Sequence, residues 1–174
     1  MHVLCLVDGD ARTLLGQDLS SSVRAVLSEN GNELELIEVG SDDVVPCLGC
    51  LLCLTKRHGV CVNLDLVARI NPRLGDFDLL CYLGPIVFGQ FSSTMKNVMD
   101  KAQINRMLRS RRLIAIGYGD DLLDEEVATF VDIVRKHRGD ANLVHPLFPE
   151  RFDVFASRSL DDNEELCKQL RGVL

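Results

Sequence analysis

Apolar and polar residues follow two different patterns along this chain. Short runs that are almost wholly apolar, such as residues 2–7 and 78–84, are typical of strands buried on both faces of a parallel sheet. Other stretches place apolar residues three or four positions apart, as at Val23, Val26 and Leu27, which predicts helices with one buried face. The pattern predicts strands at residues 2–7, 33–39, 78–84 and 111–117, and a fifth within 142–155. It predicts helices at residues 17–30, 64–74, 92–108 and 124–137, and a last one from about 161 onward.

Strands and helices alternate five times over the 174 residues, without a linker or an internal repeat. This alternation predicts one α/β domain, residues 1–174, with a parallel sheet and helices on both of its faces. Such sheets bind ligands outside the carboxyl ends of their strands, where the strand order switches. A site is therefore expected in the loops after the first, third and fourth strands.

Composition narrows the possible functions. The formal net charge of −7 argues against a nucleic-acid partner, since phosphate binding needs a basic face. The longest apolar stretch, residues 79–91, is interrupted by two glycines and a proline, so no membrane-spanning segment is expected. The first residues lack the basic start and the long apolar segment of a signal peptide, which predicts a cytoplasmic, reducing setting. Seven cysteines in such a setting are better interpreted as ligands, redox groups or buried thiols than as a disulfide framework.

A long loop at residues 42–61 holds four of the cysteines. Cys47, Cys50 and Cys53 are three positions apart and Cys61 follows, so the loop could turn all four thiolates toward one point. Four converging thiolates suit a [4Fe–4S] cluster or a tetrahedral zinc ion. A redox pair of Cys47 and Cys50, or four reduced cysteines that pack a small loop, are the other interpretations.

Two motifs give the chain a resemblance to known families. After the third strand, residues 84–101 read GPIVFGQFSSTMKNVMDK, and the cysteine motif at 46–65 precedes them. Together these motifs resemble the NAD(P)H-dependent FMN reductase and iron–sulfur flavoprotein families. The residues that keep the pattern of those families are Pro85, Phe88, Gly89, Ser92, Lys96 and Asp100. Gly84 replaces a serine, Val87 an aromatic residue and Lys101 an arginine. The aromatic contact that the resemblance implies is therefore either absent or supplied by Phe88 or Phe91.

The resemblance implies a flavodoxin-like three-layer fold with a five-stranded sheet in the order 2-1-3-4-5. It also implies an FMN-dependent redox flavoprotein that is reduced by NAD(P)H or by a [4Fe–4S] cluster at the four cysteines. Such a protein would pass electrons to an unknown acceptor and form a homodimer or homotetramer. The implied ring-binding residues are Pro85, Ile86, Val87, Phe88, Gly89, Gly117, Tyr118 and Gly119, with Tyr118 as a stacking face. The implied phosphate-binding residues follow the first strand and are Asp10, Arg12, Gln17 and Asp18.

Two acids depart from the family pattern in the phosphate loop. Asp10 stands where the families have serine, and Asp18 stands where they have threonine. A carboxylate about 4 Å from a phosphate charge costs roughly 1–4 kcal/mol. Asp18 is also a good helix N-cap, which would place its charge in the anion site. The main hypothesis is therefore an FMN-dependent oxidoreductase, and the alternative is a non-catalytic electron carrier or binding protein with weakened or lost flavin affinity.

Overall fold

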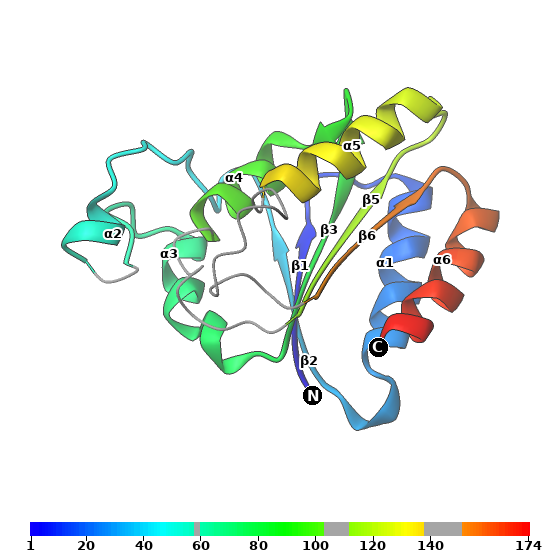
Figure 1. The fold of residues 1–174 in the computed structure, drawn as a ribbon, viewed down its shortest axis with the longest axis horizontal. Coiled ribbons are helices and arrows are strands. Elements are labelled where there is room, and N and C mark those ends of the chain that lie inside the picture. The colour runs from blue at the N-terminus through cyan, green and yellow to red at the C-terminus, as the bar shows by residue number, and fades with distance from the viewer. Residues whose placement is uncertain (58–59, 103–111, 138–150) are drawn as a thin grey trace.

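The computed structural model describes residues 1–57, 60–102, 112–137 and 151–174. Its centre is a parallel sheet in the order β2-β1-β3-β5-β6 (Figure 1), so the expected fold class and strand order are confirmed. The strands are β1 (His2–Asp8), β2 (Glu33–Val39), β3 (Leu79–Val87), β5 (Arg112–Tyr118) and β6 (Arg151–Ser157). A further strand that the sequence did not predict, β4 (Gln90–Phe91), pairs antiparallel with the end of β3.

The helices follow the strands as the hydrophobic pattern predicts, with differences at their ends. They are α1 (Leu14–Leu27), α2 (Leu52–Thr55), α3 (Leu66–Ile70), α4 (Ser93–Ala102), α5 (Asp124–His137) and α6 (Leu160–Val173). The helix expected at residues 64–74 is divided into α3 and a 3₁₀ helix, Asn71–Asp76, because Pro72 has no N–H to continue the α-helical ladder. The expected residues 103–108, 111 and 142–150 of other elements lie outside the described ranges.

Each face of the sheet carries its own hydrophobic core. Along β1, Val3, Cys5 and Val7 point to one face, while Leu4 and Leu6 point to the other. Helices α1 and α6 cover the first face, and α3, α4 and α5 cover the second (Figure 1). Burial on both faces explains why the central strands have almost no polar residues. None of the helices in the described ranges combines the length and the apolar character that a membrane-spanning segment needs.

Helix α1 begins at Leu14, three residues before the start that the sequence predicts. Thr13 is its N-cap, and the Thr13 hydroxyl accepts a hydrogen bond from the Gly16 backbone N–H at 3.0 Å. The earlier start lets Leu15 join Leu19 on the buried face of the helix. Asp18 therefore lies inside the helix, and the expectation that it caps α1 is wrong.

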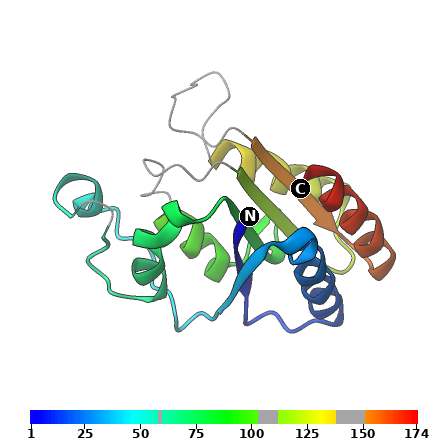
Figure 2. The same ribbon diagram turned by 90° about the horizontal axis from the view of Figure 1, so that it is seen from below.

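The cysteine-bearing segment between β2 and α3 extends away from the sheet. Figure 2 shows this segment, with α2 in it, projecting beyond α3 and α4. Its one-turn helix follows two residues with left-handed backbone, Gly49 and Leu51. The expected loop at residues 42–61 is thus a loop with one helical turn.

Candidate functional site

The loops at the carboxyl ends of β1, β3 and β5 are joined by hydrogen bonds. The Ser92 hydroxyl, after the β3–β4 hairpin, donates to the carboxylate of Asp8 at the end of β1. The Tyr118 hydroxyl, at the end of β5, donates to the Ala11 carbonyl at 3.3 Å. These contacts bring together the three loops in which the sequence places the site.

Strands β3 and β4 form a hairpin with a two-residue turn. Val87 pairs with Gln90, and the two residues between them have positive φ angles, +50° at Phe88 and +72° at Gly89. Two successive left-handed residues make a type I′ turn, which matches the twist of a hairpin. Gly89 is required here, because a Cβ at this position would lie 2.8 Å from Cγ2 of Thr129 on α5.

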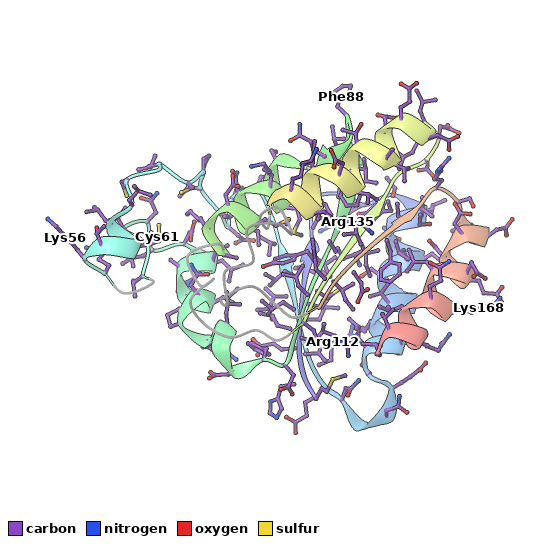
Figure 3. The ribbon with its side chains drawn as sticks, in the orientation of Figure 1. Lys56, Cys61, Phe88, Arg112, Arg135 and Lys168 are labelled. Carbon is purple, nitrogen blue, oxygen red and sulfur yellow. The ribbon has the colours of Figure 1, made fainter. Side chains whose placement is uncertain are left out.

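Phe88 occupies the tip of this hairpin, where its side chain is 88% exposed and points away from the domain (Figure 3). Bulky residues rarely adopt a positive φ, so an exposed phenylalanine in this conformation is strained. Strain of this kind gathers at ligand-binding positions. Phe91, the other aromatic residue considered from the sequence, is buried and packs edge-to-face on Phe130 at 4.8 Å. Phe88 is therefore the one of the two that can contact a ligand.

The other expected ring-binding residues divide between surface and core. Val87 is exposed beside Phe88, Pro85 is half-buried and Ile86 is buried. Gly117 is buried and pairs with Gly84 on β3, and the Gly119 N–H donates to the Ser157 carbonyl at 3.1 Å. The exposed face of the predicted ring site is thus the hairpin tip.

Tyr118 does not offer a stacking face. Its side chain is 2% exposed, its ring packs on Gly16 of α1, and its hydroxyl is bonded to Ala11. Burial, and next the nearby charge of Asp8, raise the pKa of Tyr118 to about 12. The expected stacking role is therefore wrong. Tyr118 instead holds the loop after β1 through its hydrogen bond to Ala11.

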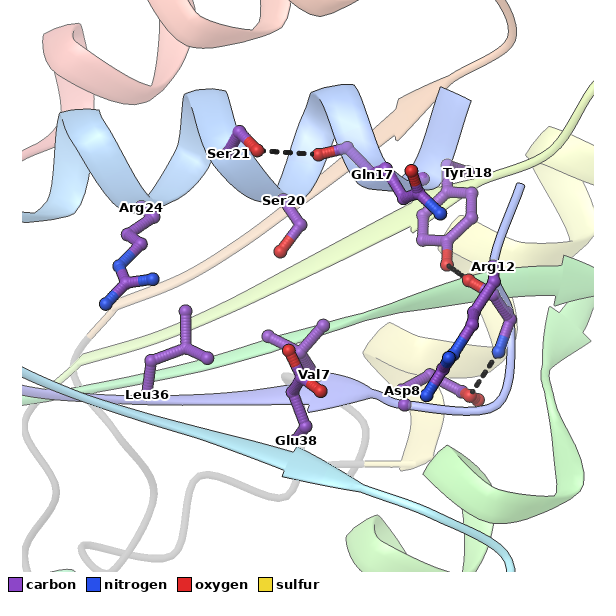
Figure 4. A pocket seen from close by; sticks show the side chains of 13 residues that line it. Val7, Asp8, Arg12, Gln17, Ser20, Ser21, Arg24, Leu36, Glu38 and Tyr118 are labelled. Atoms are coloured by element: carbon purple, nitrogen blue, oxygen red, sulfur yellow. Dashed lines mark hydrogen bonds between the residues drawn. The ribbon is translucent and has the colours of Figure 1, made fainter. Parts of the chain in front are cut away.

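Asp8 is a site residue that sequence reasoning missed. Its side chain lies at the end of β1 and the residue is 5% exposed. One carboxylate oxygen accepts the backbone N–H groups of Asp10 at 3.0 Å and Ala11 at 3.2 Å, and the other accepts from Ser92. Figure 4 shows the Asp8 carboxylate bonded to the loop that follows it. The Ser92 hydroxyl also caps α4 by accepting the Met95 N–H. An acid at the end of an otherwise apolar strand was the signal available in the sequence.

The remaining members of the expected phosphate loop lie in different places. Asp10 is exposed, and one of its carboxylate oxygens accepts from the Ser41 N–H at 2.7 Å and the Thr94 hydroxyl at 3.2 Å. Arg12 and Gln17 are exposed and line a cavity of about 430 Å³ between α1 and β2 (Figure 4). No residue of the β3–β4 hairpin lines this cavity, so it is not a pocket that joins the phosphate loop to the hairpin tip.

Asp18 faces α6 instead of the phosphate loop. Its carboxylate accepts a hydrogen bond of 2.7 Å from the side-chain amide of Asn163, which is buried. The Asn163 carbonyl oxygen in turn accepts from the Ser157 hydroxyl at 2.6 Å. The expectation that Asp18 repels a phosphate is therefore corrected, because its charge is used in the contact between α1 and α6.

The four cysteines of the α2 segment do not converge. Cys47 and Cys50 are exposed, whereas Cys53 and Cys61 are buried. Within the described ranges, no three His, Cys, Asp or Glu side chains come together in a way that could hold a metal ion. The nearby His58 lies outside those ranges. The [4Fe–4S] cluster thus stays a prediction without geometric support.

A buried ion pair closes the base of the cysteine segment. Lys101 of α4, which is fully buried, donates to the carboxylate of Asp65. Asp65 also accepts the Val45 and Ala68 backbone N–H groups at 3.0 Å each, and it caps α3. Burial alone would raise the pKa of Asp65, but the bonds from Lys101, Ala68 and Val45 outweigh burial and leave this pKa below its ordinary value. The pair thereby ties both ends of the segment to the helix that Ser92 caps.

An FMN molecule fits one half of this arrangement. At the hairpin, an exposed aromatic and an exposed valine offer a surface for a planar ring. At the phosphate loop, the N–H groups of Asp10 and Ala11 already bind the Asp8 carboxylate. The ring half of FMN therefore fits the residues present, and the phosphate half does not.

Comparisons with known proteins bear on the origin of this architecture. A family model described as NADPH-dependent FMN reductase matches residues 1–139. An iron–sulfur flavoprotein of Methanocaldococcus jannaschii is 31% identical over 77 residues, which are 44% of this chain and 39% of that protein. The chain spans about two fifths of the length of the curated relatives it matches.

Solved structures share the fold at low sequence identity. The NAD(P)H:quinone oxidoreductase from Methanothermobacter marburgensis has a TM-score of 0.73 and 14% identity, covering 99% of this chain and 96% of that one. Flavodoxin 1 from Bacillus cereus has a TM-score of 0.55 and 16% identity, covering 99% of this chain and 95% of that one. These likenesses show a flavodoxin-like fold. Because the family model extends over residues 1–139 of the 174, the chain belongs to the NADPH-dependent FMN reductase family.

Proposed function

We propose that this chain is a flavin-dependent oxidoreductase that takes electrons from NAD(P)H, with the flavin ring against the tip of the β3–β4 hairpin. The observation that carries the proposal is Phe88, an 88% exposed aromatic held with a φ of +50° at the carboxyl edge of the sheet. Family membership supports the same function. A bound flavin would supply the redox chemistry, because its ring accepts a hydride from a nicotinamide and returns the electrons to an acceptor.

The contribution of the chain is to hold and orient the ring. Phe88 presents an aromatic face, and Val87 beside it presents an apolar one. The turn that carries both side chains lies against α5, since a Cβ at residue 89 would be 2.8 Å from Cγ2 of Thr129. A rigid aromatic contact costs little conformational entropy when a planar ligand binds.

Flavin titration and nicotinamide oxidation test this function together. We expect riboflavin or FMN fluorescence to be quenched by the protein, and NADH or NADPH to be oxidised only when flavin is present. Phe88→Ala should weaken flavin binding, by about tenfold if it removes one aromatic contact. Leu64→Ala removes another highly exposed apolar side chain, 74% exposed, from a different segment and should leave binding unchanged. Absence of binding to both flavins would contradict the proposal.

A non-catalytic electron carrier or binding protein with weakened or lost flavin affinity is the second candidate function. The observation that favours it is the Asp8 carboxylate, which occupies backbone donors of the phosphate loop and so departs from an FMN site. Bound flavin without nicotinamide oxidation would support the carrier. Flavin-dependent oxidation of either nicotinamide would exclude it.

An iron–sulfur cluster at Cys47, Cys50, Cys53 and Cys61 is a separate proposal. The names of the two curated relatives, both iron–sulfur flavoproteins, favour it. The spread of the four cysteines between surface and interior argues against it. Iron and sulfide analysis of protein purified without oxygen decides between a cluster and bare thiols. The cytoplasmic setting and the homo-oligomeric state stay predictions from the sequence.

A further inference from the structure

We propose that Asp8 is an internal anion that takes the place of a flavin phosphate, so that this site selects flavins whose ribityl chain ends in a hydroxyl. This inference rests on the proposed flavin-binding function and names the class of flavin, that of riboflavin. Asp8 thereby has the unfavourable effect on phosphate binding that the sequence predicts for Asp10 and Asp18.

The first reason for this proposal is the set of hydrogen bonds in the loop after β1. A phosphate at the end of a parallel strand is bound by backbone N–H groups of the following loop and helix terminus. Here the N–H groups of Asp10 and Ala11 donate to Asp8. The Gly9 N–H donates to the Val39 carbonyl at 2.9 Å, and the Gly16 N–H donates to the Thr13 hydroxyl at 3.0 Å. Four of the backbone donors between residues 9 and 16 are therefore already bound within the chain.

Charge carries the second step. The carboxylate of Asp8 is almost completely buried, and the Ser92 hydroxyl holds its second oxygen. A phosphate entering this loop would have to displace a buried carboxylate from its donors or lie beside it. Displacement would leave the charge of Asp8 buried with the Ser92 hydroxyl but without its two backbone donors, which is unfavourable. Coexistence would place two anions within a few ångström of each other, with Asp10 adding a third.

The chemistry of the acceptors carries the third step. Carboxylates accept hydrogen bonds, and hydroxyl groups can donate them. Asp10 brings an exposed carboxylate, and Asp8 a buried one, to the loop where the ribityl chain of a flavin would end. A chain that ends in a hydroxyl brings donors and no charge, so it complements this loop. A chain that ends in a phosphate brings acceptors and negative charge, so it does not.

The test compares riboflavin with FMN by fluorescence quenching. We expect the unaltered protein to bind riboflavin about tenfold or more tightly than FMN, from the repulsion between two charges in a partly solvated site. Asp8→Asn keeps the shape and an acceptor for both backbone N–H groups but removes the charge. It should narrow the difference between the two flavins, because FMN affinity should rise while riboflavin affinity changes less. Asp18→Asn, on the α6 side of α1, should leave the difference as it is.

A second measurement uses the unaltered protein, so its result does not depend on whether a variant folds. Inorganic phosphate added to the unaltered protein should not weaken the binding of FMN, because Asp8 already holds the N–H groups of Asp10 and Ala11 that would bind a phosphate. Equal affinity for the two flavins, or competition by phosphate, would overturn the role of Asp8 while leaving the flavin-binding function intact. Failure of both flavins to bind would instead overturn the proposed function, and this inference with it.

Discussion

The ring of Tyr118 lies directly on Gly16 in the first turn of α1, so close that a Cβ at residue 16 would be 2.6 Å from two ring atoms. The contact joins the end of β5 to the start of α1, although 102 residues separate the two positions in sequence. It also fixes the loop after β1, because the Tyr118 hydroxyl bonds to Ala11 in that loop. The floor of the candidate site is thus built on a contact that only glycine allows.

Gly16→Ala should therefore destabilise the domain. The added methyl group must push the Tyr118 ring or tilt α1, and overpacking of this kind costs about 1–3 kcal/mol. Gly172→Ala is the matched control, because Gly172 is also in a helix and a Cβ there would meet nothing within 4 Å. That control should be neutral or stabilising by up to about 1 kcal/mol. Urea unfolding measures the stability of both variants against the unaltered protein. If Gly16→Ala is as stable as the unaltered protein or more stable, the Tyr118 ring does not pack tightly on residue 16.

Tyr118 should also make the folded protein less stable at alkaline pH. Its pKa is raised from 10.0 to about 12, so the folded state keeps this proton after the unfolded state has lost it. Stability from this group is complete below pH 10 and falls between pH 10 and about 12, by an amount on the order of 1 kcal/mol after allowance for solvent screening. Tyr118→Phe should remove this part of the alkaline loss. Ultraviolet titration of tyrosinate in the two proteins measures it, and an ordinary tyrosine titration near pH 10 in the folded protein would contradict burial.

The sheet was predictable from the sequence because its strands are buried on both faces. Their residues must be apolar at nearly every position, and this leaves uninterrupted runs such as residues 79–83. The hairpin was not predictable in the same way. Type I′ turns are usually recognised by Asn-Gly or Asp-Gly, and Phe88 in the first position hides that signal.

The site was less predictable than the fold, because side-chain partners depend on tertiary contacts. Thr13 and Asp18 are both good N-caps, and the burial of Leu15 decides between them. Asp18 then finds Asn163, at a sequence separation of 145 residues. Asp8 finds Ser92 at a separation of 84 residues. No local pattern could have shown either contact.

Lys101→Met should loosen the base of the cysteine segment. It leaves the Asp65 carboxylate buried with two backbone donors and no cation, and breaking a buried pair in this way costs about 3 kcal/mol. Lys96→Met on the same helix breaks a partly exposed pair with Asp100 and should cost about 1 kcal/mol or less. Urea unfolding at neutral pH compares the two.

The dependence of stability on pH below about 4 gives an independent test of the Lys101–Asp65 pair. Because the pKa of Asp65 is lowered in the folded state, its contribution to stability is complete above the ordinary value of 3.8 and is lost as the pH falls through the folded value. Loss of Lys101 raises that pKa, so the variant should lose less additional stability below pH 4 than the unaltered protein does. Parallel acid curves for the two proteins would mean that Lys101 does not set the charge of Asp65.

Phe88→Asn should stabilise the protein and weaken flavin binding. Phenylalanine at a φ of +50° carries a left-handed backbone cost of about 1–2 kcal/mol, whereas asparagine adopts this conformation readily and restores the favoured Asn-Gly turn. The variant should therefore unfold at higher urea and bind flavin more weakly, because the exposed ring is gone. Phe88→Leu keeps the strain and the apolar bulk without the aromatic face, so it should lose flavin affinity without gaining stability. If Phe88→Asn gained stability and kept its flavin affinity, the strained ring would have no role in binding, and the ring site would have to be sought elsewhere on the carboxyl edge.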